Sequence, residues 1–119
     1  MIRILIADPD SATRKALILL LQRKLGTNCV FEVKDVEALI RSLADAPPDV
    51  LLLDWRLYGS PATETSRLLR KAYPHLKIIL LSVDAADAAA AKEAGAEFVH
   101  KGASPDELIA TLTSLLRKE

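Results

Sequence analysis

The chain has 119 residues, half of them apolar and 27% charged, which fits one globular domain with a single core. Sixteen basic residues balance sixteen acidic ones, so the domain lacks the basic footprint of a nucleic-acid-binding surface and is not expected to bind nucleic acid directly. Cys29 is the only cysteine, which excludes an internal disulfide and favours a reducing, cytoplasmic setting. The sequence opens on a strand-like segment, and its longest apolar stretch, residues 16–21, is too short to cross a bilayer. We therefore expect no signal peptide and no membrane partner.

Five short apolar segments alternate with segments that carry helix signals. The predicted strands cover residues 2–7, 30–33, 50–53, 76–81 and 97–100. The predicted helices cover residues 11–25, 36–44, 63–73 and 85–94, followed by a last helix that begins at residues 104–107. Asp10 or Ser11 can cap the first helix, Gly26 stands where it should stop, and Asp35 can cap the second.

This alternation predicts an α/β fold with one parallel sheet covered by helices on both faces. Right-handed crossovers leave few topologies at this size, and the flavodoxin-like strand order 2-1-3-4-5 is the common one. The segment 50–53 is apolar throughout, as expected of a central strand buried on both faces. Since no linker or repeat interrupts the pattern, residues 1–119 are predicted to form a single domain.

Polar residues follow four of these strands: Asp8, Asp54, Ser82 and Lys101. Taken singly, each has an ordinary explanation as a helix cap, a backbone partner or a surface residue. Parallel strands end at the same edge of a sheet, however, so we expect all four to share one crevice. Two neighbouring carboxylates repel unless a cation lies between them, and their oxygens with an open crevice suit Mg²⁺. A lysine opposite such a metal suits an anion such as a phosphoryl group.

At this point the residues carry a family resemblance. Asp54 lies in Leu-Leu-Leu-Asp-Trp-Arg-Leu, Ser82 ends Ile-Ile-Leu-Leu-Ser, and Lys101 ends Ala-Gly-Ala-Glu-Phe-Val-His-Lys. With Asp8 after the first strand, this ordered set resembles the receiver domain of the response-regulator family over essentially the whole chain. The segment Lys-Gly-Ala-Ser-Pro-Asp-Glu-Leu at 101–108 is similar to the subgroup whose receivers precede a helix-turn-helix output domain.

The resemblance implies a regulatory phosphoacceptor of two-component signalling rather than an enzyme. Asp54 would take a phosphoryl group from a sensor histidine kinase in a Mg²⁺-dependent step. Lys101 and Ser82 would contact the phosphoryl oxygens, and Ser82 and Phe98 would form the conformational switch. The signal would leave through the fourth helix, fifth strand and fifth helix, the face that could also pair two copies. The receiver would either stand alone or belong to a transcription regulator whose C-terminal DNA-binding domain lies outside this chain.

The resemblance also implies a metal site, and here the sequence departs from the family pattern. The ligands would be Asp8, Asp54 and the backbone carbonyl of Arg56. The family has two adjacent acids after the first strand, but Pro9 takes the second place and brings neither an oxygen ligand nor an N–H. Asp10 can act as the substitute ligand or cap the first helix, and its position favours the cap.

A second departure is Gly102 after Lys101, where the family usually has proline, often with a cis bond. A cis bond before glycine costs roughly 2.5–4 kcal/mol, so a trans bond is expected.

Three other functions compete with the phosphoacceptor. A pseudo-receiver would share the fold but act by protein contacts without phosphorylation, and the split acid pair favours that alternative. A flavin- or nucleotide-binding protein would need a phosphate-cradling loop after the first strand, where the acids of residues 8–10 would repel phosphate. A hydrolase would need a base near Asp54, and neither His75 in a turn nor His100 in the fifth strand is placed for that role.

Overall fold

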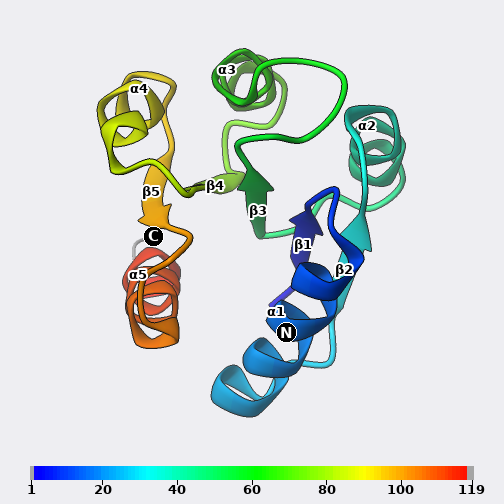
Figure 1. Ribbon diagram of the computed structural model, residues 1–119. Coiled ribbons are helices and arrows are strands. Elements are labelled where there is room, and N and C mark those ends of the chain that lie inside the picture. Colours follow the sequence, from blue (N-terminus) through cyan, green and yellow to red (C-terminus); the bar gives the residue numbers. More distant parts are fainter. Residues whose placement is uncertain (1, 118–119) are drawn as a thin grey trace.

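The computed structural model describes residues 2–117, in which strands and helices alternate throughout (Figure 1). The strands are β1 (Ile4–Ala7), β2 (Val30–Val33), β3 (Val50–Asp54), β4 (Lys77–Ser82) and β5 (Glu97–His100). The helices are α1 (Ser11–Leu25), α2 (Val36–Asp45), α3 (Ala62–Ala72), a 3-10 turn η1 (Ala85–Asp87), α4 (Ala88–Glu93) and α5 (Pro105–Arg117). Met1, Lys118 and Glu119 of the predicted domain lie outside the described residues. No helix within residues 2–117 is long and apolar enough to span a membrane.

All five strands are parallel and lie in the order β2-β1-β3-β4-β5, which confirms the predicted α/β fold. Ile4 of β1 lies opposite both Val30 and Val50, and Ser82 at the end of β4 lies opposite His100 at the end of β5. The carboxyl ends of all five strands therefore lie along one edge of the sheet. The topological switch point, where the strand order reverses, is on this edge between β1 and β3.

Helices bury the sheet on both faces, which explains why its central strands are apolar without interruption. Figure 1 shows α2, α3 and α4 on one side and α1 and α5 on the other. Leu51 and Leu53 of β3 pack in the hydrophobic core on the side of α2, α3 and α4, whereas Val50 and Leu52 pack in the core on the side of α1 and α5. Each fully buried leucine or valine contributes roughly 1.5–3 kcal/mol, so the burial of β3 on both faces firmly anchors the strand that carries Asp54 at its end.

Most helix ends follow the signals in the sequence. Asp10 caps α1, because its carboxylate accepts the backbone N–H of Thr13 at 3.0 Å, and Gly26 ends the helix in a left-handed conformation with φ 65°. Asp35 caps α2 by accepting the N–H of Ala38 at 2.8 Å. These side chains supply acceptors for N–H groups that the first helical turn leaves unpaired.

Two elements differ from prediction by more than one residue at an end. The first strand begins at Ile4 rather than residue 2, since its pairing with β2 and β3 starts there. The expected helix over residues 85–94 is divided into η1 and the six-residue α4. Asp84 accepts the N–H of Ala86 at 2.9 Å, and this local turn draws the first residues into a tighter 3-10 conformation.

The loop after β3 is held against the start of α2. The N–H of Val36 donates to the carbonyl of Tyr58 at 2.8 Å. Gly59 follows with φ 128°, and a Cβ at this position would lie 2.7 Å from the Cβ of Val36. Both the backbone conformation and the close approach therefore require glycine.

Gly59→Ala is expected to destabilise the protein more than Gly26→Ala does. Gly26 also has positive φ but has no atom within 4 Å of the added carbon, so its substitution meets only backbone strain of about 1–2 kcal/mol. Gly59→Ala adds crowding worth about 1–3 kcal/mol. Urea unfolding of both variants measures the difference, and equal losses would contradict this account of the loop.

Candidate functional site

Three charged side chains from three strand ends meet at the carboxyl edge of the sheet. Asp54 is the last residue of β3, Asp8 directly follows β1, and Lys101 directly follows β5. β1 and β3 are neighbours in the sheet, whereas β5 is separated from β3 by β4. The lysine therefore reaches across the end of β4 to the two carboxylates, as its long flexible side chain allows.

The ammonium of Lys101 bridges the two carboxylates. Its Nζ lies 2.8 Å from Oδ2 of Asp8 and 2.6 Å from Oδ1 of Asp54. Asp8 is 1% exposed and Asp54 4%, while the lysine side chain is 24% exposed. Two buried carboxylates this close would repel each other strongly, and the shared ammonium offsets that repulsion. The expectation that a cation separates the acids is thus met by Lys101 itself.

Backbone groups hold the other two carboxylate oxygens. Oδ1 of Asp8 accepts the N–H of Asp10 at 2.8 Å, and Oδ2 of Asp54 accepts the N–H of Arg56 at 3.0 Å. Every carboxylate oxygen of the pair therefore has a donor, which fixes both side chains in orientation. The side chain of Arg56 itself is exposed.

The environment of Lys101 acts on its pKa in two directions. Burial lowers the pKa, but the hydrogen bonds and charges of Asp54 and Asp8 outweigh burial, so that the pKa lies above its ordinary value of 10.5. A lysine with a raised pKa contributes stability that is fully present below the ordinary value and is lost as the pH rises through the folded-state value. The ammonium of Lys101 is therefore charged at neutral pH.

Arg14 is a further member of this site, and no pattern in the sequence points to it. Its Nη1 donates to the backbone carbonyl of Asp8 at 2.7 Å, and its Nε pairs with Glu32 of β2 at 2.7 Å. The guanidinium thus ties α1 to the loop that carries Asp8. Arg14 lies in α1, four residues after the Asp10 cap, where an arginine is usually an ordinary surface residue. Only the tertiary structure places its guanidinium next to the loop of Asp8.

The hydroxyl of Ser82 bonds to two residues of the segment that follows β4. It donates to the carboxylate of Asp87 at 2.7 Å and accepts the N–H of Asp84 at 3.1 Å. Ser82 is 4% exposed and lies at the same sheet edge as Asp54, because β4 pairs with β3. Asp87 was missed in the sequence because an unbroken helix was expected there. The 3-10 turn brings its carboxylate back over the end of β4.

The remaining predicted residues lie around this centre. Asp10 is exposed and engaged as a helix cap, and the side-chain and backbone hydrogen bonds from Thr13 hold the pKa of its carboxyl below the ordinary value. Phe98 is half-buried in β5 and packs against the core beneath α2, α3 and α4. No peptide bond within residues 2–117 is cis, as expected for the bond before Gly102.

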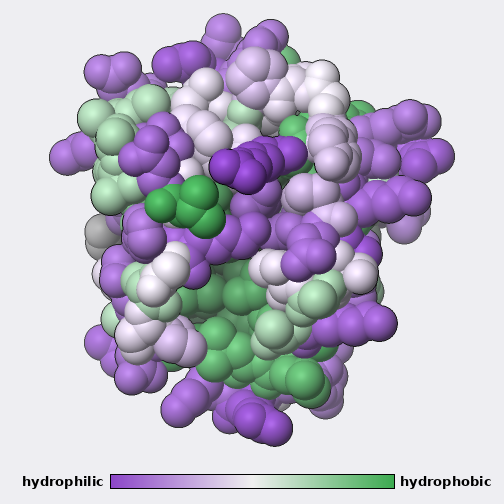
Figure 2. Space-filling model, viewed as in Figure 1, coloured by the Kyte–Doolittle hydropathy of each residue, from purple (hydrophilic) through white to green (hydrophobic). Residues whose placement is uncertain are grey.

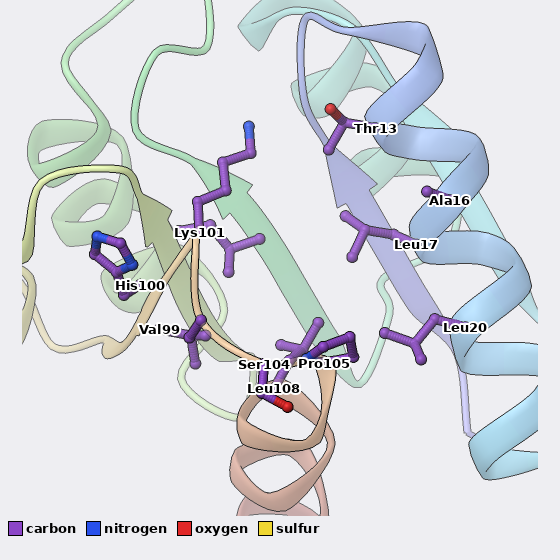
Figure 3. Close-up of a pocket in the computed structure, with 12 residues that line it drawn as sticks. Thr13, Ala16, Leu17, Leu20, Val99, His100, Lys101, Ser104, Pro105 and Leu108 are labelled. Carbon is purple, nitrogen blue, oxygen red and sulfur yellow. The ribbon is translucent and has the colours of Figure 1, made fainter.

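An apolar hollow of about 310 Å³ opens beside Lys101, between α1 and α5. Figure 2 shows the hollow as an apolar depression ringed by polar side chains. Figure 3 shows Leu17 and Leu20 of α1 facing Leu108 of α5 across it, with Lys101 at its upper rim. A partner that filled this hollow would therefore lie next to the bridged carboxylates.

The oxygen donors of this site suit Mg²⁺ better than a softer metal. Magnesium needs only one or two carboxylates and keeps several of its waters. Asp8 and Asp54 provide two carboxylates whose oxygens each retain a second lone pair beyond the contacts described. Among the described residues, no three His, Cys, Asp or Glu side chains gather into a metal cage. The residues thus fit an ion held by two carboxylates, a carbonyl and water.

The family model of the response regulator receiver domain matches residues 4–113, and the chain belongs to this family. Its resemblance to receivers, inferred from Asp8, Asp54, Ser82 and Lys101, is confirmed. A receiver domain is a regulatory phosphoacceptor of two-component phosphorelays rather than a conventional enzyme, and the family typically uses Mg²⁺.

Curated relatives include transcription regulators. The phosphate regulon transcriptional regulatory protein PhoB of Pseudomonas aeruginosa is 30% identical over 120 residues, which cover 97% of this chain and 52% of that protein. The response regulator UvrY of Escherichia coli is 28% identical over 118 residues, covering 97% and 54%. The chain thus spans about half the length of the curated relatives it matches.

Solved structures of receivers match the fold closely. A two-component response regulator of the LuxR family from an Aurantimonas species has a TM-score of 0.88 and 28% identity, over 98% of this chain and 85% of that one. The BeF3-activated receiver domain of DrrB has a TM-score of 0.86 and 25% identity, over 99% of each chain.

Lys101→Met is expected to destabilise the protein at neutral pH by about 3 kcal/mol, the low end for breaking a buried ion pair, because the ammonium is partly exposed. The exposed Lys92→Met serves as the control and should change little. The difference from wild type should persist up to about pH 10.5 and then disappear as the pH rises through the higher folded-state pKa of Lys101, where the ammonium loses its charge.

Urea unfolding across pH tests this, and adding Asp54→Asn to Lys101→Met should restore part of the loss, since only one buried carboxylate then remains charged. A neutral-pH loss no larger than that of Lys92→Met would contradict the bridging role.

Proposed function

We propose that Asp54 is the phosphoacceptor of this receiver and takes its phosphoryl group from a phosphohistidine of a sensor histidine kinase. The observation that carries the proposal is the bridge of Lys101 between two buried carboxylates at the end of the central strand. Structural ion pairs on a protein surface need neither this burial nor this sharing. Family membership adds the class of reaction.

The transfer forms one bond and breaks another. A carboxylate oxygen of Asp54 attacks phosphorus, a P–O bond forms, and the P–N bond to the donor imidazole breaks, with the electron pair returning to the imidazole nitrogen. The N–H of Arg56 orients the attacking carboxylate, and the N–H of Asp10 orients its neighbour Asp8. Lys101 keeps a positive charge beside the phosphoryl oxygens, where negative charge accumulates.

Asp8, Asp54 and the backbone carbonyl of Arg56 would hold Mg²⁺. A bound magnesium ion neutralises charge between carboxylates and an incoming phosphoryl group. Asp10 stays at the helix cap in this proposal, because Thr13 already satisfies its carboxylate with two hydrogen bonds. With Pro9 in the place of the second acid, the site has one carboxylate fewer than the family pattern, and metal affinity is correspondingly low.

The switch consists of Ser82 and Phe98. To reach a phosphoryl group on Asp54, the hydroxyl of Ser82 must leave Asp87, with which it bonds at 2.7 Å. That exchange frees the turn η1 and the start of α4, and the ring of Phe98 can then move into the space. The phosphoryl group shifts the population of two conformations of the face formed by α4, β5 and α5.

The partners follow from the same proposal. The sensor kinase would present its phosphohistidine beside the apolar hollow between α1 and α5, which opens next to Lys101. The face of α4 and α5 would pair two activated copies. Because relatives of about twice this length are transcriptional regulatory proteins, a C-terminal DNA-binding domain would carry the output. Such signalling operates in the cytoplasm, at no membrane surface, and this neutral domain would not bind DNA itself.

A pseudo-receiver remains the second candidate, and Pro9 is the observation that favours it. Without a second acid next to Asp8, Mg²⁺ would bind too weakly to compete, and Lys101 could hold Asp8 and Asp54 permanently. The domain would then signal only through protein contacts. The two functions differ in one measurable event, the appearance of a phosphoryl group on Asp54.

With Mg²⁺ and a small phosphodonor such as phosphoramidate, we expect the chain to gain the mass of one phosphoryl group. Asp54→Asn should abolish the adduct, whereas Asp45→Asn, at an exposed carboxylate at the end of α2, should leave it intact. Intact-protein mass spectrometry under non-acidic, cold conditions measures the adduct. An unmodified wild-type chain, or an adduct that survives in Asp54→Asn, would sink the phosphoacceptor proposal.

Trp55 offers a second readout of the same event. It is half-buried directly after Asp54, and its backbone N–H donates to the carbonyl of Leu81 at 2.8 Å. Mg²⁺ with beryllofluoride should therefore change its fluorescence, and the change should be absent in Asp54→Asn. A pseudo-receiver would leave the spectrum unaltered at millimolar concentrations of both reagents.

Asp10→Ser distinguishes the helix-capping role of Asp10 from a role as a Mg²⁺ ligand. Serine caps helices about as well as aspartate, so Asp10→Ser should keep the stability that Asp10→Ala loses, about 1 kcal/mol. Because Asp10 is proposed to stay at the cap, Asp10→Ser should also bind Mg²⁺ as wild type does, measured through Trp55 fluorescence. A stable Asp10→Ser variant with weakened Mg²⁺ binding would make Asp10 the replacement ligand instead.

A further inference from the structure

His100, next to Lys101, makes two hydrogen bonds that none of the roles above uses. Its Nε2 lies 2.8 Å from the carbonyl of Val83, and its Nδ1 accepts the N–H of Gly102 at 3.1 Å. A carbonyl can only accept and an N–H can only donate, so the proton must be on Nε2. The imidazole is therefore neutral, in a single tautomer, and each ring nitrogen has a fixed partner.

Gly102 leaves room for the imidazole of His100 and also supplies the N–H that its Nδ1 accepts. A Cβ at position 102 would lie 3.0 Å from Cε1 and 3.3 Å from Nδ1 of His100, so a side chain there would push the ring aside by a few tenths of an ångström. Proline would in addition remove the N–H that Nδ1 accepts. The glycine that departs from the family pattern thus leaves both the space and the N–H that this ring position uses.

The imidazole joins the two loops that carry the phosphoryl-contacting side chains. Val83 directly follows Ser82 after β4, and Gly102 directly follows Lys101 after β5. The strands pair as far as Ser82 and His100, and the N–H of Lys101 then donates to the carbonyl of Ser82 at 2.7 Å. Figure 3 shows the His100 ring and the Lys101 ammonium leaving the end of β5 in different directions, the ring away from the hollow. The ring adds a side-chain clamp beyond the last backbone contact.

We propose that His100 is a positioning residue for Lys101, clamping the lysine loop to the Ser82 loop. The clamp does for this loop what a proline after the lysine would do by stiffening the backbone. It rests on the proposed role of Lys101 in phosphoryl transfer. It also links the two loops mechanically, so a movement of the Ser82 loop reaches Lys101 through Val83, His100 and Gly102.

The tautomer tests the clamp without any phosphorylation. In the chain labelled with ¹⁵N-histidine, His100 at neutral pH should show one proton-bearing Nε2 and one unprotonated Nδ1. The exposed His75 should average between tautomers, and His75→Gln assigns the two sets of signals. A His100 that averages in the same way would overturn the proposal.

A double-mutant cycle tests positioning. His100→Ala and Gly102→Ala should each slow phosphorylation of Asp54 by a small phosphodonor about tenfold, since small misplacements of a catalytic group have effects of this size. In the double variant the ring that the new Cβ would displace is absent, so the second substitution should add almost nothing. Additive losses would refute the matched pair.

Gly102→Pro sharpens the cycle. Alone it should slow phosphorylation more than Gly102→Ala, because it removes the N–H as well as crowding the ring. Combined with His100→Ala it should regain rate relative to His100→Ala alone, since proline then stiffens the vacated loop. Urea unfolding checks that each variant is folded, and the alanine cycle alone decides the matter if the proline variant is not. A merely structural histidine would show no such regain.

Failure of the clamp is distinguishable from failure of the proposed function. If wild type takes no phosphoryl group on Asp54, the phosphoacceptor proposal fails, while the tautomer and the coupling of His100 and Gly102 in unfolding free energy still test the clamp. If wild type is phosphorylated but the cycle is additive, only the clamp fails.

Discussion

The ion bridge of Lys101 between Asp8 and Asp54 is the constraint on which the rest of the site depends. Two carboxylates exposed by 1% and 4% cannot both stay charged side by side without a cation. The sheet supplies that cation because its order brings β5 within a lysine's reach of β1 and β3. The ammonium thus turns the repulsion between the two carboxylates into a stable arrangement. An incoming anion would compete with the carboxylates for this ammonium.

Around the bridge, contacts from separate parts of the chain restrict each functional group. Arg14 holds the carbonyl of Asp8, and backbone N–H groups hold the carboxylates. Asp87 holds the hydroxyl of Ser82, and His100 holds the loop after Lys101. These residues contact no phosphoryl group in the proposed mechanism. They decide where the groups that do so point, and how far each must move when the state of Asp54 changes.

The departures from the family pattern have different physical consequences. Pro9 removes a carboxylate, and the carboxylate of Asp10 caps α1 in this structure. Gly102 removes a proline, but the ring of His100 fills the room and takes the free N–H. The change at Pro9 therefore removes a carboxylate from the site, while the change at Gly102 replaces a stiff proline backbone with a hydrogen bond to a side chain.

The sequence by itself determined the fold and the principal site residues, because local signals carry both. Apolar runs mark strands buried on both faces, caps at Asp10 and Asp35 mark helix starts, and polar residues at strand ends must share an edge once the strands are parallel. Only the tertiary structure decided the partners of these residues. Arg14, Asp87 and His100 act through contacts between elements distant in sequence or through a turn too irregular to predict. Such contacts depend on ångström-scale placement, which no periodicity or spacing encodes.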